Sequence, residues 1–201
     1  KAGTATVSFK AGGKSYKVKG YMIPYFDNYQ MMMFNNIASY NYITPINAGI
    51  KVGVYFYSGA TTKKEAVKEA DYVLKRIKEY NVELPVFFDI EYHNGARITK
   101  ALKNKRGKAT NICMAFMNKV KKAGYTPMVY TYRNLMNNYL YPQKFVYGGY
   151  GIWIADYNTV CKFTYPYVSW QYTSSGKVPG ISKKKKGKWS TADCPFWTAA
   201  G

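Results

Sequence analysis

The stretch PVFFDIEYH, residues 85–93, decides the fold that we predict for this chain. After a proline, its first half is bulky and apolar, which is typical of a strand buried on both faces. Two acids, Asp89 and Glu91, then follow two residues apart. Because side chains alternate along a strand, we expect both carboxylates on one face, roughly 6 to 7 Å apart at the backbone. The stretch therefore predicts a buried strand with an acid pair at its carboxyl end.

Two long helices are predicted, one on each side of this strand in the sequence. The first covers residues 63–80, behind a Thr62-x-x-Glu65 capping box. The second covers residues 108–123 and ends at Gly124, a residue suited to a C-terminal cap. The apolar positions at helical spacing are Ala66, Val67, Ala70, Val73, Leu74 and Ile77 in the first helix, and Ala109, Ile112, Cys113, Phe116, Met117, Val120 and Ala123 in the second.

Short apolar runs, rich in β-branched and aromatic residues, alternate with these helical patterns. Such alternation predicts parallel βαβ units in a single α/β domain over residues 1–201. Counted generously, the runs make eight strands, which fits a closed, irregular TIM-like barrel; an open doubly wound sheet is the alternative, because periodicity does not prove closure. Seven of these runs lie at 4–9, 20–26, 51–57, 84–90, 127–132, 150–157 and 168–173, and residues 31–48 are a further helical candidate.

The composition restricts the class of protein. Thirty Lys and Arg against ten Asp and Glu give a formal charge of +20, which favours an anionic partner such as nucleic acid, acidic lipid or the polymers of a bacterial wall. No apolar run has the roughly 20 residues that a membrane helix needs, so we expect no membrane span. Three cysteines without CxxC spacing indicate neither a disulfide framework nor a zinc site, although a Cys161–Cys194 bridge stays open.

The acid pair carries the chemical prediction. In a poorly hydrated space two neighbouring carboxyls differ in proton affinity, which leaves one protonated and one ionised. Cleavage of a glycosidic bond needs that combination, a proton donor for the leaving oxygen and an anion that stabilises the positive sugar centre. The alternatives are a solvated strand end, or a divalent metal held by both acids and His93; we expect neither a metal nor a cofactor, because hard metals gather more oxygen ligands.

At this point the chain resembles the family 25 glycoside hydrolases, lysozymes that act as N-acetylmuramidases on bacterial peptidoglycan. The resemblance rests on ordered segments over roughly residues 41–197. They are AGIKVGVYFYS at 48–58, LPVFFDIE at 84–91, AGYTPMVYTY at 123–132, GIWIADY at 151–157, VSWQYTSSGKVPGI at 168–181 and ADCPFW at 192–197.

The resemblance implies an irregular barrel of eight strands with about five helices and assigns roles to residues. Glu91 corresponds to the general acid/base, Asp89 to the partner carboxylate and Asp193 to a late aspartate of the site. Asp156 is either a ligand contact or a salt-bridged strand end. The positions that correspond to the lining of a sugar groove are Tyr55, Tyr57, Tyr130, Trp153, Trp170 and Gln171.

The resemblance also implies a secreted muramidase that acts at the bacterial cell wall, with its basic surface on anionic wall polymers. One departure favours a second hypothesis, a catalytically impaired peptidoglycan-binding module. The family's first strand carries an aspartate, and the best alignment, residues 4–8, places Thr6 there; either that strand has diverged or the segment is not the first strand. A third hypothesis, a nucleic-acid binder, lacks any recognition motif of that class, so we expect no specific nucleic acid partner.

Overall fold

The computed structural model describes residues 3–11, 14–22 and 53–174 of the chain. Most of the described chain is one α/β unit with a parallel sheet of five strands. The strands are β3 (Val54–Tyr57), β4 (Val86–Asp89), β5 (Pro127–Tyr132), β6 (Gly151–Ala155) and β7 (Ser169–Gln171). The helices are α3 (Lys63–Ile77), α4 (Arg97–Leu102), α5 (Arg106–Lys122), α6 (Arg133–Tyr139) and α7 (Pro142–Tyr147).

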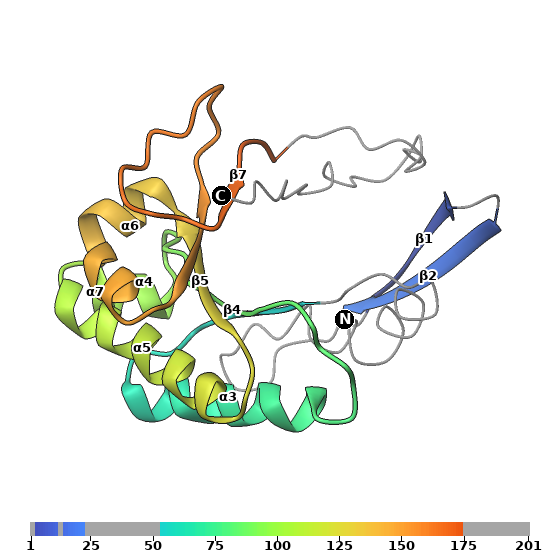
Figure 1. Ribbon diagram of the computed structural model, residues 1–201, viewed down its shortest axis with the longest axis horizontal. Helices are drawn as coiled ribbons and strands as arrows, with labels where there is room; N and C mark the ends of the chain where they lie inside the picture. Colours follow the sequence, from blue (N-terminus) through green and yellow to red (C-terminus); the bar gives the residue numbers. More distant parts are fainter. Residues whose placement is uncertain (1–2, 12–13, 23–52, 175–201) are drawn as a thin grey trace.

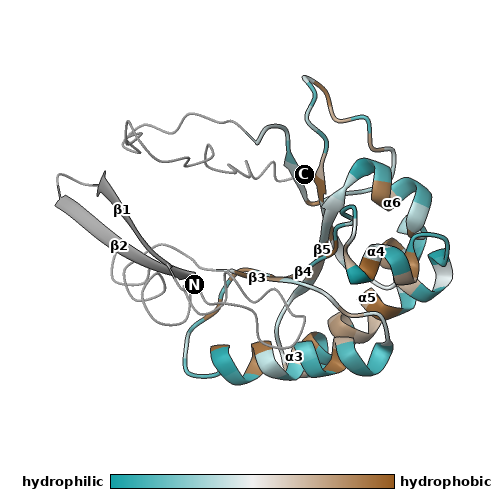
Figure 2. Ribbon diagram, turned by 180° about the vertical axis from the view of Figure 1, so that it is seen from behind, coloured by the Kyte–Doolittle hydropathy of each residue, from teal (hydrophilic) through white to brown (hydrophobic). Residues whose placement is uncertain are grey.

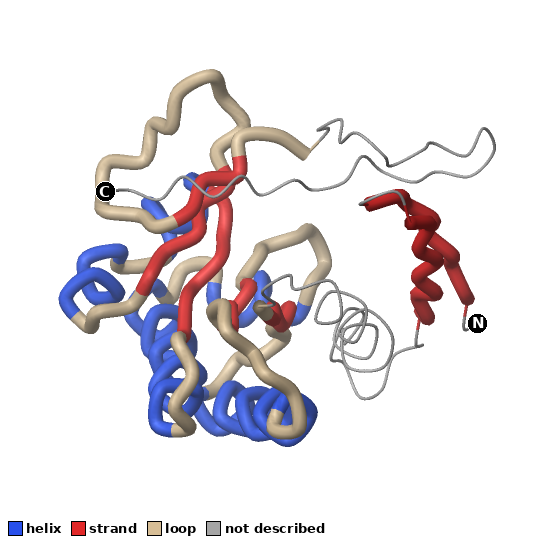
Figure 3. Tube along the Cα trace, turned by 45° about the vertical axis from the view of Figure 1, so that its right-hand side comes forward, coloured by secondary structure: helices blue, strands red, loops and turns tan. Residues whose placement is uncertain are grey.

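The strands of the sheet are neighbours in chain order, β3-β4-β5-β6-β7, and every pairing is parallel. Right-handed crossovers between strands that follow one another in this way place all the connecting helices on the same face. Figure 1 shows α3 to α7 gathered on one side of the sheet, and Figure 3 shows the same layering from another direction. This order argues against the doubly wound alternative, which would reverse within the sheet and carry helices on both faces.

The core lies between the sheet and the two long helices. One set of alternating strand residues, which includes Phe56, Phe88 and Val129, is buried there. The Phe116 ring of α5 lies 4.9 Å from the Phe88 ring and 6.2 Å from the Phe56 ring, centroid to centroid. Cys113, one turn earlier on α5, is fully buried in the same core. Both polar and apolar residues colour α3 in Figure 2, as its amphipathic pattern predicts.

Both long helices lie close to the predicted bounds, although α3 ends at Ile77 rather than at residue 80, and their predicted caps form at least in part. The Thr62 side chain accepts a hydrogen bond from the Glu65 backbone N–H at the start of α3. Only this half of the capping box forms, because the Glu65 carboxylate accepts instead from the backbone N–H and the hydroxyl of Thr61. After α5, Gly124 has a φ of +87°, the left-handed conformation that favours glycine at a helix end. The short helices α4, α6 and α7 were not predicted.

The first strands correct the prediction for the N-terminal segment. β1 (Gly3–Ala11) and β2 (Lys14–Met22) form an antiparallel hairpin, a sheet separate from the parallel one, with Thr6 opposite Lys19. The residues expected to connect two strands are therefore mostly strand themselves. The pairing supports the view that residues 4–8 are not the first strand of a barrel, so Thr6 does not mark the place of a missing acid.

The prediction of eight strands is met in part. The described residues contain the five parallel strands and the hairpin, while the helical candidate at 31–48 lies outside them. An α/β fold with a parallel sheet is what the structure has. Among the described helices, none combines the length and the apolar character needed to cross a bilayer.

Candidate active site

The parallel sheet brings most of the predicted site residues onto one face. Across it, Tyr57 pairs with Asp89, Asp89 with Tyr130, and Tyr130 with Trp153. In a parallel sheet, residues in register point to the same side, and their chain neighbours, such as Phe88, are buried against the helices. This row therefore lies on the face opposite α3 to α7. We call it the acid face; it consists of Tyr55, Tyr57, Phe87, Asp89, Tyr130, Trp153 and Gln171.

Aromatic contacts give the acid face a defined surface. The Trp153 ring lies 4.6 Å from the Tyr130 ring and 5.0 Å from the Phe87 ring, both edge to face. The Tyr130 hydroxyl donates a hydrogen bond of 2.8 Å to Oε1 of Gln171, which is buried. Tyr130 and Trp153 are themselves half-buried. The face thus combines aromatic rings with polar groups, a combination that suits a sugar ligand.

The two acids follow one another at the carboxyl end of β4. Asp89 is the last residue of the strand and only 6% exposed, whereas the side chain of Glu91 is 23% exposed. Between them, Ile90 is fully buried, and its backbone N–H donates to the Tyr130 carbonyl. The chain thus stays tied to β5 just beyond the strand. This end of a parallel sheet is where α/β proteins build their sites.

His93, which the sequence suggested as a metal ligand or an ordinary loop residue, is the partner of Glu91. Its Nε2 lies 2.9 Å from Oε2 of Glu91. Its ring stacks on Tyr57, with centroids 6.2 Å apart and planes 24° from parallel. In the described part of the chain, no group of three or more His, Cys, Asp and Glu side chains is arranged to hold a metal ion.

Asp156 and Trp170 lie away from the acid face. Asp156 is 5% exposed, and its carboxylate accepts hydrogen bonds from the Lys162 N–H and the Asn158 amide and pairs with Arg133 Nε at 2.9 Å. Burial pushes the pKa of Asp156 upward, but these three partners outweigh burial and hold the pKa below its ordinary value. The Trp170 indole donates to the Asp156 carbonyl at 2.8 Å. The arrangement is that of a salt-bridged strand end.

Trp170 also lines a surface pocket that contains neither Asp89 nor Glu91. The pocket has a volume of about 550 Å³ and lies beyond the carboxyl ends of β6 and β7. Its lining is Tyr157, Asn158, Thr159, Trp170 and Tyr172. Of the adjacent residues 170 and 171, the glutamine is thus the one on the acid face. Asp193, the third predicted acid, lies outside the described residues, as does Cys194.

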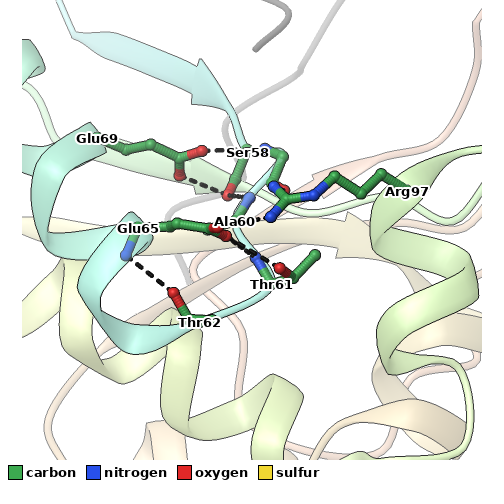
Figure 4. Close-up of polar contacts among 8 residues, drawn as sticks. Ser58, Ala60, Thr61, Thr62, Glu65, Glu69 and Arg97 are labelled. Atoms are coloured by element: carbon green, nitrogen blue, oxygen red, sulfur yellow. Dashed lines mark hydrogen bonds and ion pairs between the residues drawn. The ribbon is translucent and has the colours of Figure 1, made fainter. Parts of the chain in front are cut away.

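Sequence reasoning missed a polar cluster beside the acids. Glu69, on α3, is 3% exposed, and its carboxylate accepts from the Ser58 hydroxyl and the Gly59 N–H (Figure 4). Burial raises the pKa of Glu69 to about 7, although both hydrogen bonds oppose the rise. A signal existed in the sequence, because residue 69 falls at helical spacing between the buried Ala66 and Val73 of α3. An acid on an apolar stripe indicates a specific polar partner.

An acid pair at the carboxyl end of a parallel sheet, beside an aromatic surface, is typical of glycoside hydrolases. Residues 31–181 match the model of the family described as glycosyl hydrolases family 25. The match covers most of the chain, so this protein belongs to that family.

Individual relatives agree with the family. The chain is 28% identical over 137 residues to the autolytic lysozyme of Clostridium acetobutylicum, and this match covers 68% of the chain and 38% of the relative. It is 31% identical over 129 residues to the D-alanyl-L-alanine endopeptidase of Streptococcus phage B30, and this match covers 59% of the chain and 27% of the relative. The chain therefore spans well under half the length of both curated relatives.

A solved structure shares the fold. The modular autolysin LytC from Streptococcus pneumoniae, in complex with a synthetic peptidoglycan ligand, matches with a TM-score of 0.61 and 29% sequence identity. The match covers 70% of this chain and 34% of LytC.

Proposed function

We propose that this chain is a lysozyme-type muramidase, which hydrolyses the glycosidic bond between N-acetylmuramic acid and N-acetylglucosamine in bacterial peptidoglycan. The observation that carries the proposal is the placement of Asp89 and Glu91 at the carboxyl end of β4, next to an aromatic face. Membership of family 25 and the likeness to an autolytic lysozyme support it.

In the proposed reaction, Glu91 is the general acid that protonates the leaving oxygen and then the base that activates water. Its half-buried position limits hydration while leaving the carboxyl accessible to a ligand. Asp89, nearly buried beside it, stabilises the positive charge that develops on the sugar. Asp193 is proposed to complete the acidic set.

The acid face supplies the proposed sugar groove. Tyr130 and Trp153 offer aromatic surface to the sugar rings, and Gln171 offers an amide to their hydroxyl or acetamido groups. Tyr55 and Tyr57 extend the same face on the side of β3. Trp170 was predicted as a groove residue, and Asp156 as either a ligand contact or a salt-bridged strand end. For both we propose only an indirect contribution, through the pocket that Trp170 lines.

We further propose that the parallel sheet is part of an irregular eight-stranded barrel in one domain, with the acid face turned inward. A sheet with helices on one face only can bury its other face by closing on itself. The site of action proposed for the secreted enzyme is the bacterial cell wall, where a charge of +20 concentrates it on anionic polymers.

The proposal is tested with the purified chain on a suspension of bacterial walls. The wild type is expected to clear the suspension and to release reducing sugar ends. Glu91→Gln, which keeps the size of the side chain but cannot exchange a proton, is expected to lower the rate at least about a hundredfold. Glu79→Gln is the matched control, because Glu79 is exposed and follows α3, which packs on the face of the sheet opposite the acid face (Figure 1). Undiminished clearing by Glu91→Gln would contradict the role of Glu91.

The same assay separates the impaired-module hypothesis from the enzyme. Binding of the wild type to insoluble peptidoglycan without release of reducing ends would favour that hypothesis. The observation that suggested it, Thr6 in place of a first-strand acid, loses its basis because residues 4–8 lie in the antiparallel hairpin.

A further inference from the structure

The segment that carries Glu91, residues 90–96, is anchored at both ends to one loop, residues 58–62. This loop joins β3 to α3 and contains no residue assigned to the proposed reaction. The anchors come from two carboxylates of α3 and one arginine of α4 (Figure 4). We call this group the brace; it consists of Ser58, Gly59, Glu65, Glu69 and Arg97.

The first anchor precedes the acids. The Ser58 backbone N–H donates to the Asp89 carbonyl at 2.8 Å. The Ser58 hydroxyl, fully buried, donates to Oε2 of Glu69 at 2.6 Å and accepts from the Ala60 N–H at 3.1 Å. Glu69 also accepts from the Gly59 N–H at 3.1 Å. A buried carboxyl of α3 thereby fixes the turn that holds the end of β4.

The second anchor follows the acids. Arg97, the first residue of α4, donates to Oε1 of Glu65 at 2.5 Å and to the Gly59 carbonyl at 3.3 Å. Burial acts to raise the pKa of Glu65, but the Arg97 guanidinium and the donors of Thr61 dominate and lower it to about 2. The Glu65 carboxylate is therefore charged throughout the neutral range, so the ion pair persists.

The opposite side of the segment is held by β5. The Thr131 hydroxyl donates to the Ile90 carbonyl at 2.6 Å, and the Tyr132 hydroxyl donates to the Tyr92 carbonyl at 3.3 Å. Residues 90–96 are thus held between the loop 58–62 on one side and β5 on the other. Without the brace, the β5 contacts would remain, and the segment could pivot about them.

We propose that the brace positions Glu91, and that Ser58, Glu69 and Arg97 are positioning residues for the reaction although none of them lies on the acid face. The inference rests on the role proposed for Glu91. A displacement of about 1 Å in a reacting group can lower a rate about a hundredfold. Loss of the brace is therefore expected to lower kcat by roughly tenfold or more, with KM changed less than threefold, because the acid face itself is untouched.

Two pairs of variants test the brace. Arg97→Gln removes the ion pair at a half-exposed position, and Arg76→Gln, on the exposed side of α3, is its matched control. Glu69→Met keeps the length of the side chain without its acceptors, whereas Glu69→Gln keeps an acceptor for Gly59 and a donor for the Ser58 oxygen. We expect kcat to fall in Arg97→Gln and Glu69→Met, and to stay within about threefold of the wild type in the other two. Soluble peptidoglycan fragments are the substrate.

His93 gives a readout that does not depend on activity. It is the only histidine of the chain, and it contacts Glu91 at 2.9 Å, so its ring proton NMR signal reports on the acid segment alone. The signal is expected to shift in Arg97→Gln and Glu69→Met and to stay in place in Arg76→Gln and Glu69→Gln. Thermal unfolding of all four variants identifies any that fails to fold. Because Arg97 lies at the surface, we expect Arg97→Gln to fold like the wild type.

The outcomes separate the brace from the proposed function. A wild type without activity whose His93 signal still moves in the two brace variants would overturn the muramidase and leave the brace standing. An active wild type with wild-type kcat and an unmoved signal in folded Arg97→Gln would overturn the brace. An equal loss of kcat in Glu69→Gln and Glu69→Met would also overturn it, because the hydrogen bonds would then not be the cause.

Discussion

The buried carboxyl of Glu69 makes the free energy of unfolding of the chain depend on pH. Its pKa is raised by burial from 4.5 to about 7, so the folded chain binds this proton more tightly than the unfolded chain does. Its stabilising contribution is therefore complete below about pH 4.5 and is lost as the pH rises to about 7. The difference between the two pKa values corresponds to about 3 kcal/mol in the free energy of unfolding.

Glu69→Gln should remove this dependence, because the amide does not titrate. Relative to the wild type, the variant is expected to gain up to about 3 kcal/mol between pH 4.5 and pH 8. Urea unfolding of both proteins at the two pH values measures the gain. A constant difference across this range would contradict the raised pKa of Glu69.

Asp156 predicts the opposite dependence. Despite its burial, the Lys162 N–H, Arg133 and the Asn158 amide hold its pKa below the ordinary value of 3.8. Its contribution is present above that value and is lost as the pH falls through the folded pKa. We expect Asp156→Asn to cost about 2 kcal/mol at pH 7 and less at pH 3, in unfolding experiments at both values. Stability equal to the wild type at pH 7, with a raised KM, would instead indicate a ligand contact.

At the level of single residues, strand alternation predicted the row of side chains that contains Asp89, but not the position of Glu91, which follows the end of β4. The four residues that pair across this row all belong to predicted strands. They are Tyr57, Asp89, Tyr130 and Trp153, each in register with the next on the neighbouring strand. The contact between His93 and Glu91 could not be predicted, because the chain leaves the strand after Asp89 and the period-two rule no longer applies. The partner of Glu69 could not be predicted for a similar reason, since Ser58 lies in the loop after β3.

At the level of elements, prediction succeeded where a long periodic pattern or a cap existed. The strand at 127–132 and the start of α3 at residue 63 agree with the prediction. The helices α4, α6 and α7 have six or seven residues, and none of them has a side-chain hydrogen bond at its N-cap. Such short helices are stabilised mainly by packing, and the one local signal among them, Pro142 at the start of α7, is too weak to predict a helix.

The end of α5 supplies a prediction at this scale. Gly124 has a φ of +87°, and a Cβ built there would meet no atom within 4 Å. Gly124→Ala should therefore cost about 1 kcal/mol through backbone conformation alone, and Gly124→Asn should cost less. Thermal or urea unfolding of the two variants measures the order. A larger loss in the asparagine variant would contradict a conformational origin.

For the whole molecule, the predicted α/β class was right and the placement of the N-terminal segment was not. Two apolar runs of β-type residues do not show whether they pair with each other or with a distant sheet, because pairing partners are set by the fold. The parallel pairing of β3, β4 and β5 was predictable from the two long helices between them, which prevent hairpin connections. The connections that lead to β6 and β7 carried no predicted helix, so their parallel pairing did not follow from the sequence. Closure into a barrel stays a prediction.

The net charge of +20 predicts how activity responds to salt. If the basic surface concentrates the enzyme on anionic wall polymers, clearing of walls should slow several-fold between 50 and 300 mM NaCl, because ions screen this attraction. Hydrolysis of short soluble peptidoglycan fragments, which lack the anionic wall polymers and carry few charges, should change less, since their encounter gains less from the field. Parallel rate measurements on both substrates test this. Equal salt dependence would exclude a role of the surface charge in wall binding.

The burial of Cys113 between the helices and the sheet has a kinetic consequence. Its thiol is fully enclosed, and burial raises its pKa, so both access and the reactive thiolate are suppressed in the folded chain. Cys161, half-buried in a loop, lacks this protection. Alkylation at Cys113 therefore requires the contact between α5 and the sheet to open. The rate of alkylation at Cys113 therefore measures how often the contact between α5 and the sheet opens, and the faster alkylation at Cys161 serves as the accessible reference.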